Sequence, residues 1–245
     1  ICYSSYGKKL HKTFFDKKID LDLEIPNIQI KEDTVITYSA LKMNDYVPNG
    51  LGTTNNSFKF KNETKEIETY EFAKSTFPSY VSYAKGINYQ TFEVSIEETS
   101  LLIILPDEEI DLNTINVSEA YSNYMEKREN VSCYGYIPYF HNKTLGADIT
   151  NSVKSSIQGN EIFYSKLLKD SVENDLFLDK VIQSNDFEFN EKGVAGKSLT
   201  MQVLCGSAGP SEDEPVDLSV NRPFYAISLK DGFPLFINKV SNPGK

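Results

Sequence analysis

The sequence predicts an α+β fold with large β-sheets. Segments with the alternating pattern of strands dominate, helix patterns are interspersed among them, and the C-terminal part is again rich in strand patterns. The chain has 245 residues, which suits one domain or at most two. It is 40% hydrophobic, with 15 Phe and 15 Tyr, so it can build a substantial core. We therefore expect a single domain over residues 1–245.

Strand patterns come first along the chain. After a mixed segment of residues 1–33, expected to hold a short helix and a strand, β-branched and aromatic residues recur in stretches bounded by turn formers. The strands expected before residue 106 are Val35–Leu41, Ser57–Lys61, Lys65–Phe72, Ile87–Ile96 and Leu101–Leu105. The last two should form a hairpin through Glu97-Glu98-Thr99-Ser100. Because Leu101–Leu105 is apolar throughout, both of its faces should be covered.

Helix patterns follow. Pro106 and the acidic residues after it predict a helix start, since Pro suits the first turn and acids suit the positive end of the helix dipole; this helix should run to about Arg128. Apolar residues spaced four apart over 149–157 predict a short amphipathic helix closed by Gly159. Further strands are expected at Phe177–Phe189, Phe224–Leu229 and Leu235–Val240, the last two joined by the turn Lys230-Asp231-Gly232.

The charge of the chain argues against several kinds of partner. There are 35 acidic and 25 basic residues, which gives a net charge of -10. No basic patch with interleaved aromatics occurs, so no nucleic-acid partner is expected, and the acidic excess is interpreted as a solvated surface. No apolar run reaches the roughly 20 residues that span a membrane. We expect a monomer with no membrane partner.

Residues for catalysis or metal binding do not form known patterns. His11 and His141 lack metal-type spacing, and no G-x-S-x-G nucleophile elbow occurs. Cys2, Cys133 and Cys205 also lack metal-binding spacing and leave at least one thiol unpaired. The sequence therefore predicts neither an enzyme nor a bound metal or cofactor.

Sequons favour a secreted glycoprotein. The candidate glycosylation sites are Asn55, Asn62, Asn116, Asn130 and Asn142. Chance matches are expected in a chain rich in Asn. The chain starts at Ile1 without a basic-then-apolar leader, so either a leader has been removed or this N-terminus is not native.

Residues 190–221 form the least regular part of the sequence. A long connection without its own secondary structure is usually functional or disordered. With the strand period of two, one face of its first half is uncharged and mostly small: Val194, Gly196, Ser198, Thr200, Gln202 and Leu204. The only charge, Lys197, falls on the other face. The segment could therefore enter a sheet with its uncharged face buried, and a merely flexible polar loop is the alternative.

Several blocks of the sequence resemble the serpin family. Asn190-Glu191-Lys192-Gly193 resembles the hinge before the serpin reactive loop, and Leu218–Tyr225 resembles the C-terminal signature. Asp231–Pro243 is similar to the family's ending, Ser100–Glu108 to a strand that precedes a helix, and Val35–Met43 to the central strand beside which the loop inserts. The blocks occur in family order. The resemblance implies an α+β serpin-like fold with large mixed β-sheets, a reduced set of N-terminal helices, and a reactive loop at about 193–217.

The sequence also departs from the family pattern. Serpins have a much longer, helix-rich N-terminal half before the central strand. The usual Trp after that strand is absent, with Tyr46 and Val47 near its place, and Ala226 and Ser228 are smaller or more polar than usual. The size and the Asn-, Lys- and Tyr-rich composition are similar to shortened serpins encoded by viruses. For such a protein, the cytoplasm of an infected host cell is the alternative to secretion.

The resemblance implies a suicide-substrate mechanism. A target protease attacks the loop and forms an acyl-enzyme, and it is distorted when the loop inserts as a new strand of the main sheet. The hinge residues so implied are Glu191, Lys192, Gly193, Val194, Ala195, Gly196, Lys197, Ser198 and Leu199. Gly193 can take backbone angles closed to other residues. Lys197 and Leu199 depart from the usual Ala-rich hinge, but both fall on the solvent face.

The family's register places the reactive bond between Ser207 and Ala208. The recognition residues before it are Leu204, Cys205 and Gly206. A slip of one or two residues would make Cys205, Gly206 or Ala208 the recognised residue. Because the loop beyond Ser198 holds no Lys or Arg, a serine protease that prefers small residues is expected rather than a trypsin-like one; a cysteine protease is the other partner considered. Cys205 would be accessible to oxidation or pairing, or it is an incidental thiol.

A second interpretation is a member of the same family that does not inhibit proteases. The shortened N-terminal half and the unusual hinge favour a non-inhibitory, serpin-fold binding or decoy protein that uses another surface.

Overall fold

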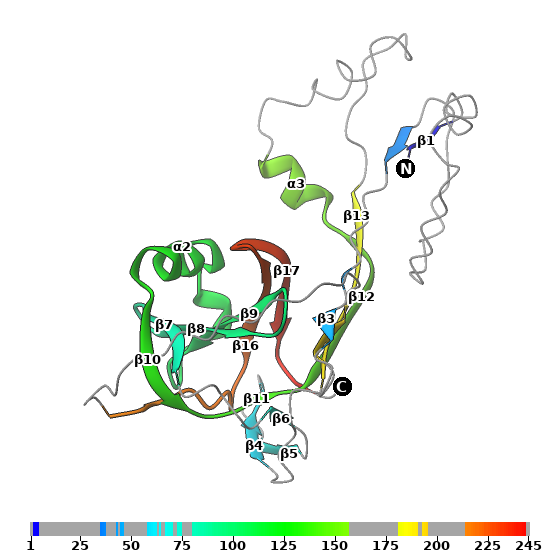
Figure 1. The fold of residues 1–245 in the computed structure, drawn as a ribbon. Helices are drawn as coiled ribbons and strands as arrows, with labels where there is room; N and C mark the ends of the chain where they lie inside the picture. The colour runs from blue at the N-terminus through cyan, green and yellow to red at the C-terminus, as the bar shows by residue number, and fades with distance from the viewer. Residues whose placement is uncertain are drawn as a thin grey trace. The chain divides into compact units, whose positions relative to one another are not determined.

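Figure 1 shows the fold in a computed structural model. The structure describes residues 2–4, 35–37, 43, 45–46, 58–62, 64, 67–70, 73–74, 80–156, 181–190, 193–195 and 214–243. The chain forms two compact units. The first holds Ile1–Lys42 and Lys143–Asp186, and the second holds Met43–Asn142 and Phe187–Lys245.

A seven-stranded mixed sheet forms most of the second unit. Its strand order is β15-β10-β7-β8-β9-β16-β17. The strands are β7 (Tyr80–Lys85), β8 (Tyr89–Ser95), β9 (Ser100–Pro106), β10 (Glu129–Tyr134), β15 (Val216–Asp217), β16 (Phe224–Lys230) and β17 (Phe233–Val240). Neighbours pair antiparallel, except that β15 pairs parallel with β10.

Strand β9 lies inside this sheet, between β8 and β16. All five residues of Leu101–Leu105 are 0% exposed. Because side chains alternate along a strand, Leu101, Ile103 and Leu105 enter one apolar cluster while Leu102 and Ile104 enter another. The predicted covering of both faces is therefore confirmed, as is the predicted β8–β9 hairpin.

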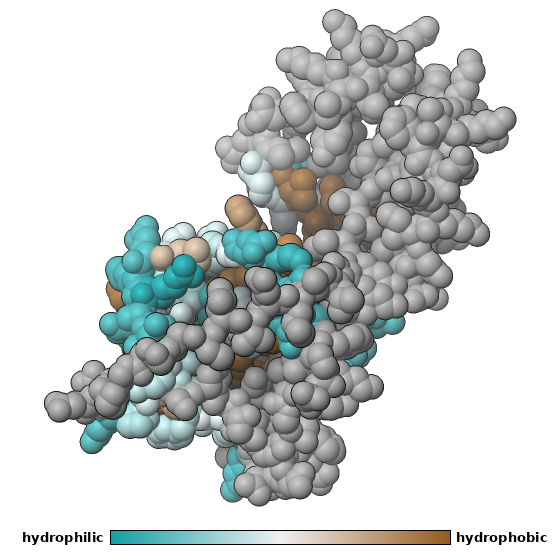
Figure 2. Space-filling model, viewed as in Figure 1, coloured by the Kyte–Doolittle hydropathy of each residue, from teal (hydrophilic) through white to brown (hydrophobic). Residues whose placement is uncertain are grey.

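Helix α2 (Val117–Lys127) covers the second of these faces through Ala120 and Tyr124. Asn116 caps it by accepting from the Glu119 amide at 3.2 Å. Figure 2 shows mainly hydrophilic residues over this helix, in keeping with its amphipathic pattern.

The predicted helix start at Pro106 is wrong. Pro106 is the last residue of β9, and a turn follows in which the Ile110 amide donates to the Asp107 carbonyl at 3.2 Å and Glu109 has φ 66°. A short 3-10 helix η2 (Leu112–Thr114) comes before α2. Proline and acids suit a turn after a strand as well as a first helical turn, so the local pattern did not distinguish them.

A four-stranded sheet has the order β12-β13-β14-β3. Its strands are β12 (Phe140–Asp148), β13 (Ile182–Asn190), β14 (Gly193–Ala195) and β3 (Asp45–Tyr46). Strands β12 and β13 contribute residues to both units. Strand β13 agrees with the predicted Phe177–Phe189 from Ile182 onward; residues 177–180 lie outside the described residues.

Within its described residues, the first unit holds the strand pair β1–β2 and the helix α3, besides its parts of β12 and β13. Strand β1 (Cys2–Ser4) pairs antiparallel with β2 (Val35–Thr37). Helix α3 (Thr150–Ser156) begins after Asp148, which accepts from the Thr150 amide at 3.0 Å. The predicted short helix is confirmed over these residues, and its expected end at Gly159 lies outside the described residues.

Two further strand pairs belong to the second unit. Strand β4 (Phe58–Lys61) pairs antiparallel with β5 (Ile67–Tyr70), and β6 (Ala73–Lys74) with β11 (Ile137–Pro138). The predicted turn between β16 and β17 is also confirmed: Asp231 and Gly232 have φ 51° and 78°, as a two-residue hairpin turn requires. None of the described helices is long and apolar enough to cross a membrane.

An aromatic core supports the four-stranded sheet. Phe187 on β13 stacks on Phe140 at 5.8 Å and lies 5.6 Å from Phe236, while Phe140 meets Phe224 edge-on at 5.7 Å. Phe187 is fully buried. The rings therefore join the two sheets of the second unit.

Phe187→Ala should lower the free energy of unfolding by about 3–5 kcal/mol, because it leaves a cavity among these rings. Phe233→Ala is the matched control, since Phe233 is 72% exposed, and it should change stability by no more than about 0.5 kcal/mol. Urea unfolding followed by tyrosine fluorescence measures both. Equal losses in the two variants would contradict a core role for Phe187.

Candidate functional site

The candidate site is the place where the start of the predicted loop joins the four-stranded sheet. Strand β14 lies between β13 and β3 and is antiparallel to both. Gly193 is opposite Asn190 and Tyr46, and Val194 is opposite Phe189 and Asp45. The first residues of the loop are thus paired with a strand on each side.

Gly193 is the first residue of β14 and is paired with Asn190, the last residue of β13. It is buried and has φ 122°, a conformation that side-chain-bearing residues rarely adopt. The glycine is therefore required by the backbone here.

Strand β13 forms the apolar side of the site. Phe189 is 1% exposed and lies 5.2 Å from Tyr139 and 5.9 Å from Phe140, ring centre to ring centre. The register sets Val194 opposite Phe189 and Ala195 opposite half-buried Glu188. The predicted burial of one face of the loop stays a prediction.

Strand β3 forms the other side. It follows Met43, which is 4% exposed. The Met43 sulfur accepts a hydrogen bond from the Ser228 hydroxyl at 3.5 Å. The predicted neighbour of the loop was Val35–Met43. Among the described residues, however, β14 pairs with Asp45–Tyr46, just beyond that segment, and Val35–Thr37 pairs with β1. Because residues 196–204 lie outside the described residues, the pairing of the inserted loop with Val35–Met43 stays a prediction.

The far end of the predicted loop is held in the seven-stranded sheet. Cys133 is opposite Val216 in the parallel β10–β15 pair, and the Leu218 and Val220 amides donate to the carbonyls of Tyr134 and Tyr136, both at 2.9 Å. Leu218 and Val220 are 0% exposed. The structure therefore describes both anchors of the loop.

Most predicted loop residues remain predictions. Three groups of predicted residues lie outside the described residues: the hinge residues Glu191, Lys192, Gly196, Lys197, Ser198 and Leu199, the recognition residues Leu204, Cys205 and Gly206, and the reactive pair Ser207 and Ala208.

Cys133 lies on β10, and burial raises the pKa of its thiol. No cluster of three or more metal-ligating side chains occurs among the residues that the structure describes.

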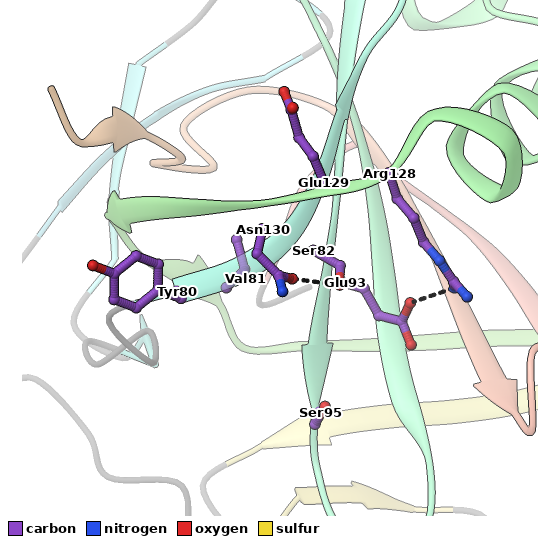
Figure 3. A pocket seen from close by; sticks show the side chains of 8 residues that line it. All are labelled: Tyr80, Val81, Ser82, Glu93, Ser95, Arg128, Glu129 and Asn130. Atoms are coloured by element: carbon purple, nitrogen blue, oxygen red, sulfur yellow. Dashed lines mark hydrogen bonds and ion pairs between the residues drawn. The ribbon is translucent and has the colours of Figure 1, made fainter. Parts of the chain in front are cut away.

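A polar cavity of about 600 Å³ lies between β7, β8 and the start of β10 (Figure 3). Its Glu93 carboxylate lies 3.9 Å from the Arg128 guanidinium and accepts from the hydroxyls of Tyr124 and Ser100. Burial, and secondarily Glu93, raises the pKa of Tyr124 well above its usual value. The Glu93 carboxylate is thus already paired with Arg128 and hydrogen-bonded to two hydroxyls, so this cluster is better interpreted as a structural hydrogen-bond network than as a catalytic site.

The predicted glycosylation sites differ in accessibility. Asn116 and Asn130 are exposed. Asn62 is 9% exposed and accepts from the Thr64 hydroxyl at 2.8 Å, so its amide lies within the fold. The Asn142 amide donates to the Lys239 carbonyl at 3.1 Å. Asn55 lies outside the described residues.

Comparisons with solved structures find the same fold in several proteins. Thyroxine-binding globulin in complex with thyroxine matches at 16% identity with a TM-score of 0.59, over 98% of this chain and 64% of that one. A serpin from the trematode Schistosoma haematobium matches at 20% identity with a TM-score of 0.57, over 87% of this chain and 58% of that one. Tengpin, a thermophilic serpin in its native state, matches at 16% identity with a TM-score of 0.56, over 83% of this chain and 53% of that one. The chain thus spans between about half and two thirds of their lengths.

The sequence comparison decides the family. A search of curated proteins finds no significant match. The family profile described as serpin (serine protease inhibitor) matches residues 51–243. At 16–20% identity the solved structures show the fold alone, a serpin fold with mixed sheets. Because the profile covers well over half of a chain that also has this fold, the chain belongs to the serpin family.

Proposed function

We propose that this chain inhibits a protease as a suicide substrate, through the loop that runs between β14 and β15. The observation that carries the proposal is the pairing of Gly193–Ala195 between β13 and β3. A strand that has begun to insert can lengthen by adding main-chain hydrogen bonds on both sides, each of about 1 kcal/mol net.

The proposed chemistry is an interrupted peptide hydrolysis. The protease nucleophile attacks the carbonyl carbon of Ser207, and the peptide bond to Ala208 breaks. The protease's general acid passes the proton taken from the nucleophile to the leaving amine. The loop, now ending in an acyl link to the protease, inserts before water can hydrolyse that link. The serpin chain supplies no catalytic group, in keeping with a family whose members are generally inhibitors rather than enzymes.

The loop composition favours a target that accepts small side chains. The recognition residues proposed above are small or apolar, and the loop beyond Ser198 has no basic residue for a trypsin-like pocket. We propose a serine protease of elastase-like or subtilisin-like preference, with a cysteine protease as the second class. We also propose a monomeric, secreted glycoprotein, or alternatively a virus-encoded protein in the host cytoplasm.

A non-inhibitory binding or decoy protein is the second candidate. Among the matching structures is one named as a complex with thyroxine, which is a serpin-fold protein holding a small molecule.

A protease panel separates the two candidates. Incubation with elastase-like, subtilisin-like, trypsin-like and cysteine proteases should give a covalent complex on a denaturing gel with one that accepts small residues. Cleavage of the loop alone should raise the melting temperature strongly, because the freed strand can insert. Cleavage without a complex and without a rise in melting temperature would favour the binding protein.

Val194→Glu should convert the inhibitor into a substrate that is cleaved without trapping the protease. The register places residue 194 opposite the buried Phe189 and Asp45, and an uncompensated buried charge costs about 3–5 kcal/mol. Val194→Gln is the matched control, because it has the shape of Glu without the charge and should retain more of the covalent complex. A denaturant-resistant complex with Val194→Glu at wild-type yield would show that the register is wrong.

Glycosylation should follow the exposure of the sequons. After expression in a secretory eukaryotic host, glycopeptide mass spectrometry should find occupancy at Asn116 and Asn130, whose side chains are exposed. Asn62 should remain unmodified because its side chain is buried and hydrogen-bonded. Occupancy of Asn62 equal to that of Asn130 would contradict the described packing of Asn62.

A further inference from the structure

Asp45 places a buried carboxylate on β3, the strand that pairs with the hinge. It is 5% exposed. Its two oxygens accept from the backbone amides of Glu97 at 3.2 Å, Glu98 at 3.3 Å and Thr99 at 2.9 Å, and from the Thr99 hydroxyl. These donors form the turn between β8 and β9, so one side chain of the four-stranded sheet caps a turn of the seven-stranded sheet.

The β8–β9 turn is held rigidly by its own hydrogen bonds and by the strands that flank it. The Ile96 amide donates to the Thr99 carbonyl at 3.0 Å, and the strands on both sides pair over their full length. Glu98 also accepts from the Lys230 ammonium at 2.9 Å, at the end of β16. The hydrogen bond that Lys230 donates to Glu98 raises the pKa of Lys230, and the charges of Glu98, Asp231 and Asp45 act in the same direction. Asp45 therefore connects β3 to a turn whose position is fixed by the β8–β9 and β9–β16 pairs and by the Lys230–Glu98 ion pair.

Strand β3 itself depends on this tie. It has two residues, and β14 is its only strand neighbour among the described residues. Hydrogen bonds to a charged acceptor are roughly twice as strong as those between neutral groups, so four of them outweigh the few ladder bonds of so short a strand. The residue that carries the anchor, Asp45, is also the residue opposite Val194.

We infer that Asp45 is a positioning residue for loop insertion. Its carboxylate holds β3 where β14 can lie between β3 and β13. Without this carboxylate β3 detaches from the β8–β9 turn, β14 loses one of its two partners, and insertion slows relative to hydrolysis of the acyl link. The inference about inhibition rests on the proposed function, whereas the pairing of β14 is present in the chain without a protease.

Amide hydrogen exchange tests the inference without a protease. Asp45→Asn keeps the shape but replaces one acceptor oxygen with an amide that faces backbone donors. Peptides covering 97–99 and 193–195 should both exchange faster, by about tenfold or more. Thr99→Val removes only the hydroxyl donor and should give a smaller effect in the same direction. Asp111→Asn, which alters an exposed cap on the Asn113 amide, is the control and should leave 193–195 unchanged.

The pattern of exchange separates positioning from simple turn capping. Faster exchange at 97–99 with unchanged exchange at 193–195 in both Asp45→Asn and Thr99→Val would overturn the inference. If Asp45→Asn does not fold, Thr99→Val carries the comparison, because Val is nearly isosteric with Thr and keeps all three backbone donors.

A second arm measures the effect on inhibition with the protease found in the panel. Asp45→Asn should shift the products from covalent complex toward cleaved chain, while Asp111→Asn should leave the product ratio unchanged. An unchanged product ratio would overturn the link between Asp45 and insertion. If the wild-type chain traps no protease, the proposed function fails, and the exchange at 193–195 still decides whether Asp45 positions the hinge.

Discussion

The packing of Phe187 and Phe189 beneath β13 is the constraint on which the rest of the site depends. Both rings lie on one face of the strand and meet Phe140, which in turn contacts Phe224 of the seven-stranded sheet. Because side chains alternate along a strand, burying these rings fixes which face of β13 points inward. A slip of one residue would bring Glu188 into the aromatic core, so the register of β13 is strongly specified.

The register of β13 determines how the loop enters the sheet. Gly193 has φ 122°, and Val194 is opposite Phe189 on β13 and Asp45 on β3. The strand that carries the aromatic rings therefore also sets the pairing of β14.

The two sides of the site are held by different forces. Strand β13 is fixed by buried aromatic rings, whereas β3 is fixed by a carboxylate that accepts from the backbone of a turn. Aromatic packing spreads over many contacts, but the anchor of β3 is concentrated in one side chain and is directional. Any widening of the sheet for a longer strand is therefore governed most directly at β3.

The sequence alone determined the features whose causes are local. Strand period and apolar content were enough for the β8–β9 hairpin and the buried Leu101–Leu105, and Asp231-Gly232 was enough for the β16–β17 turn. Pro106 was misleading because proline suits both a helix start and the end of a strand. Only the tertiary structure revealed Asp45, whose partners lie 52 to 54 residues away, and the pairing of Gly193 and Val194 with Asp45–Tyr46, just beyond the predicted partner Val35–Met43. A carboxylate's role depends on the donors that the fold brings to it, and no pattern around Asp45 encodes the turn it caps.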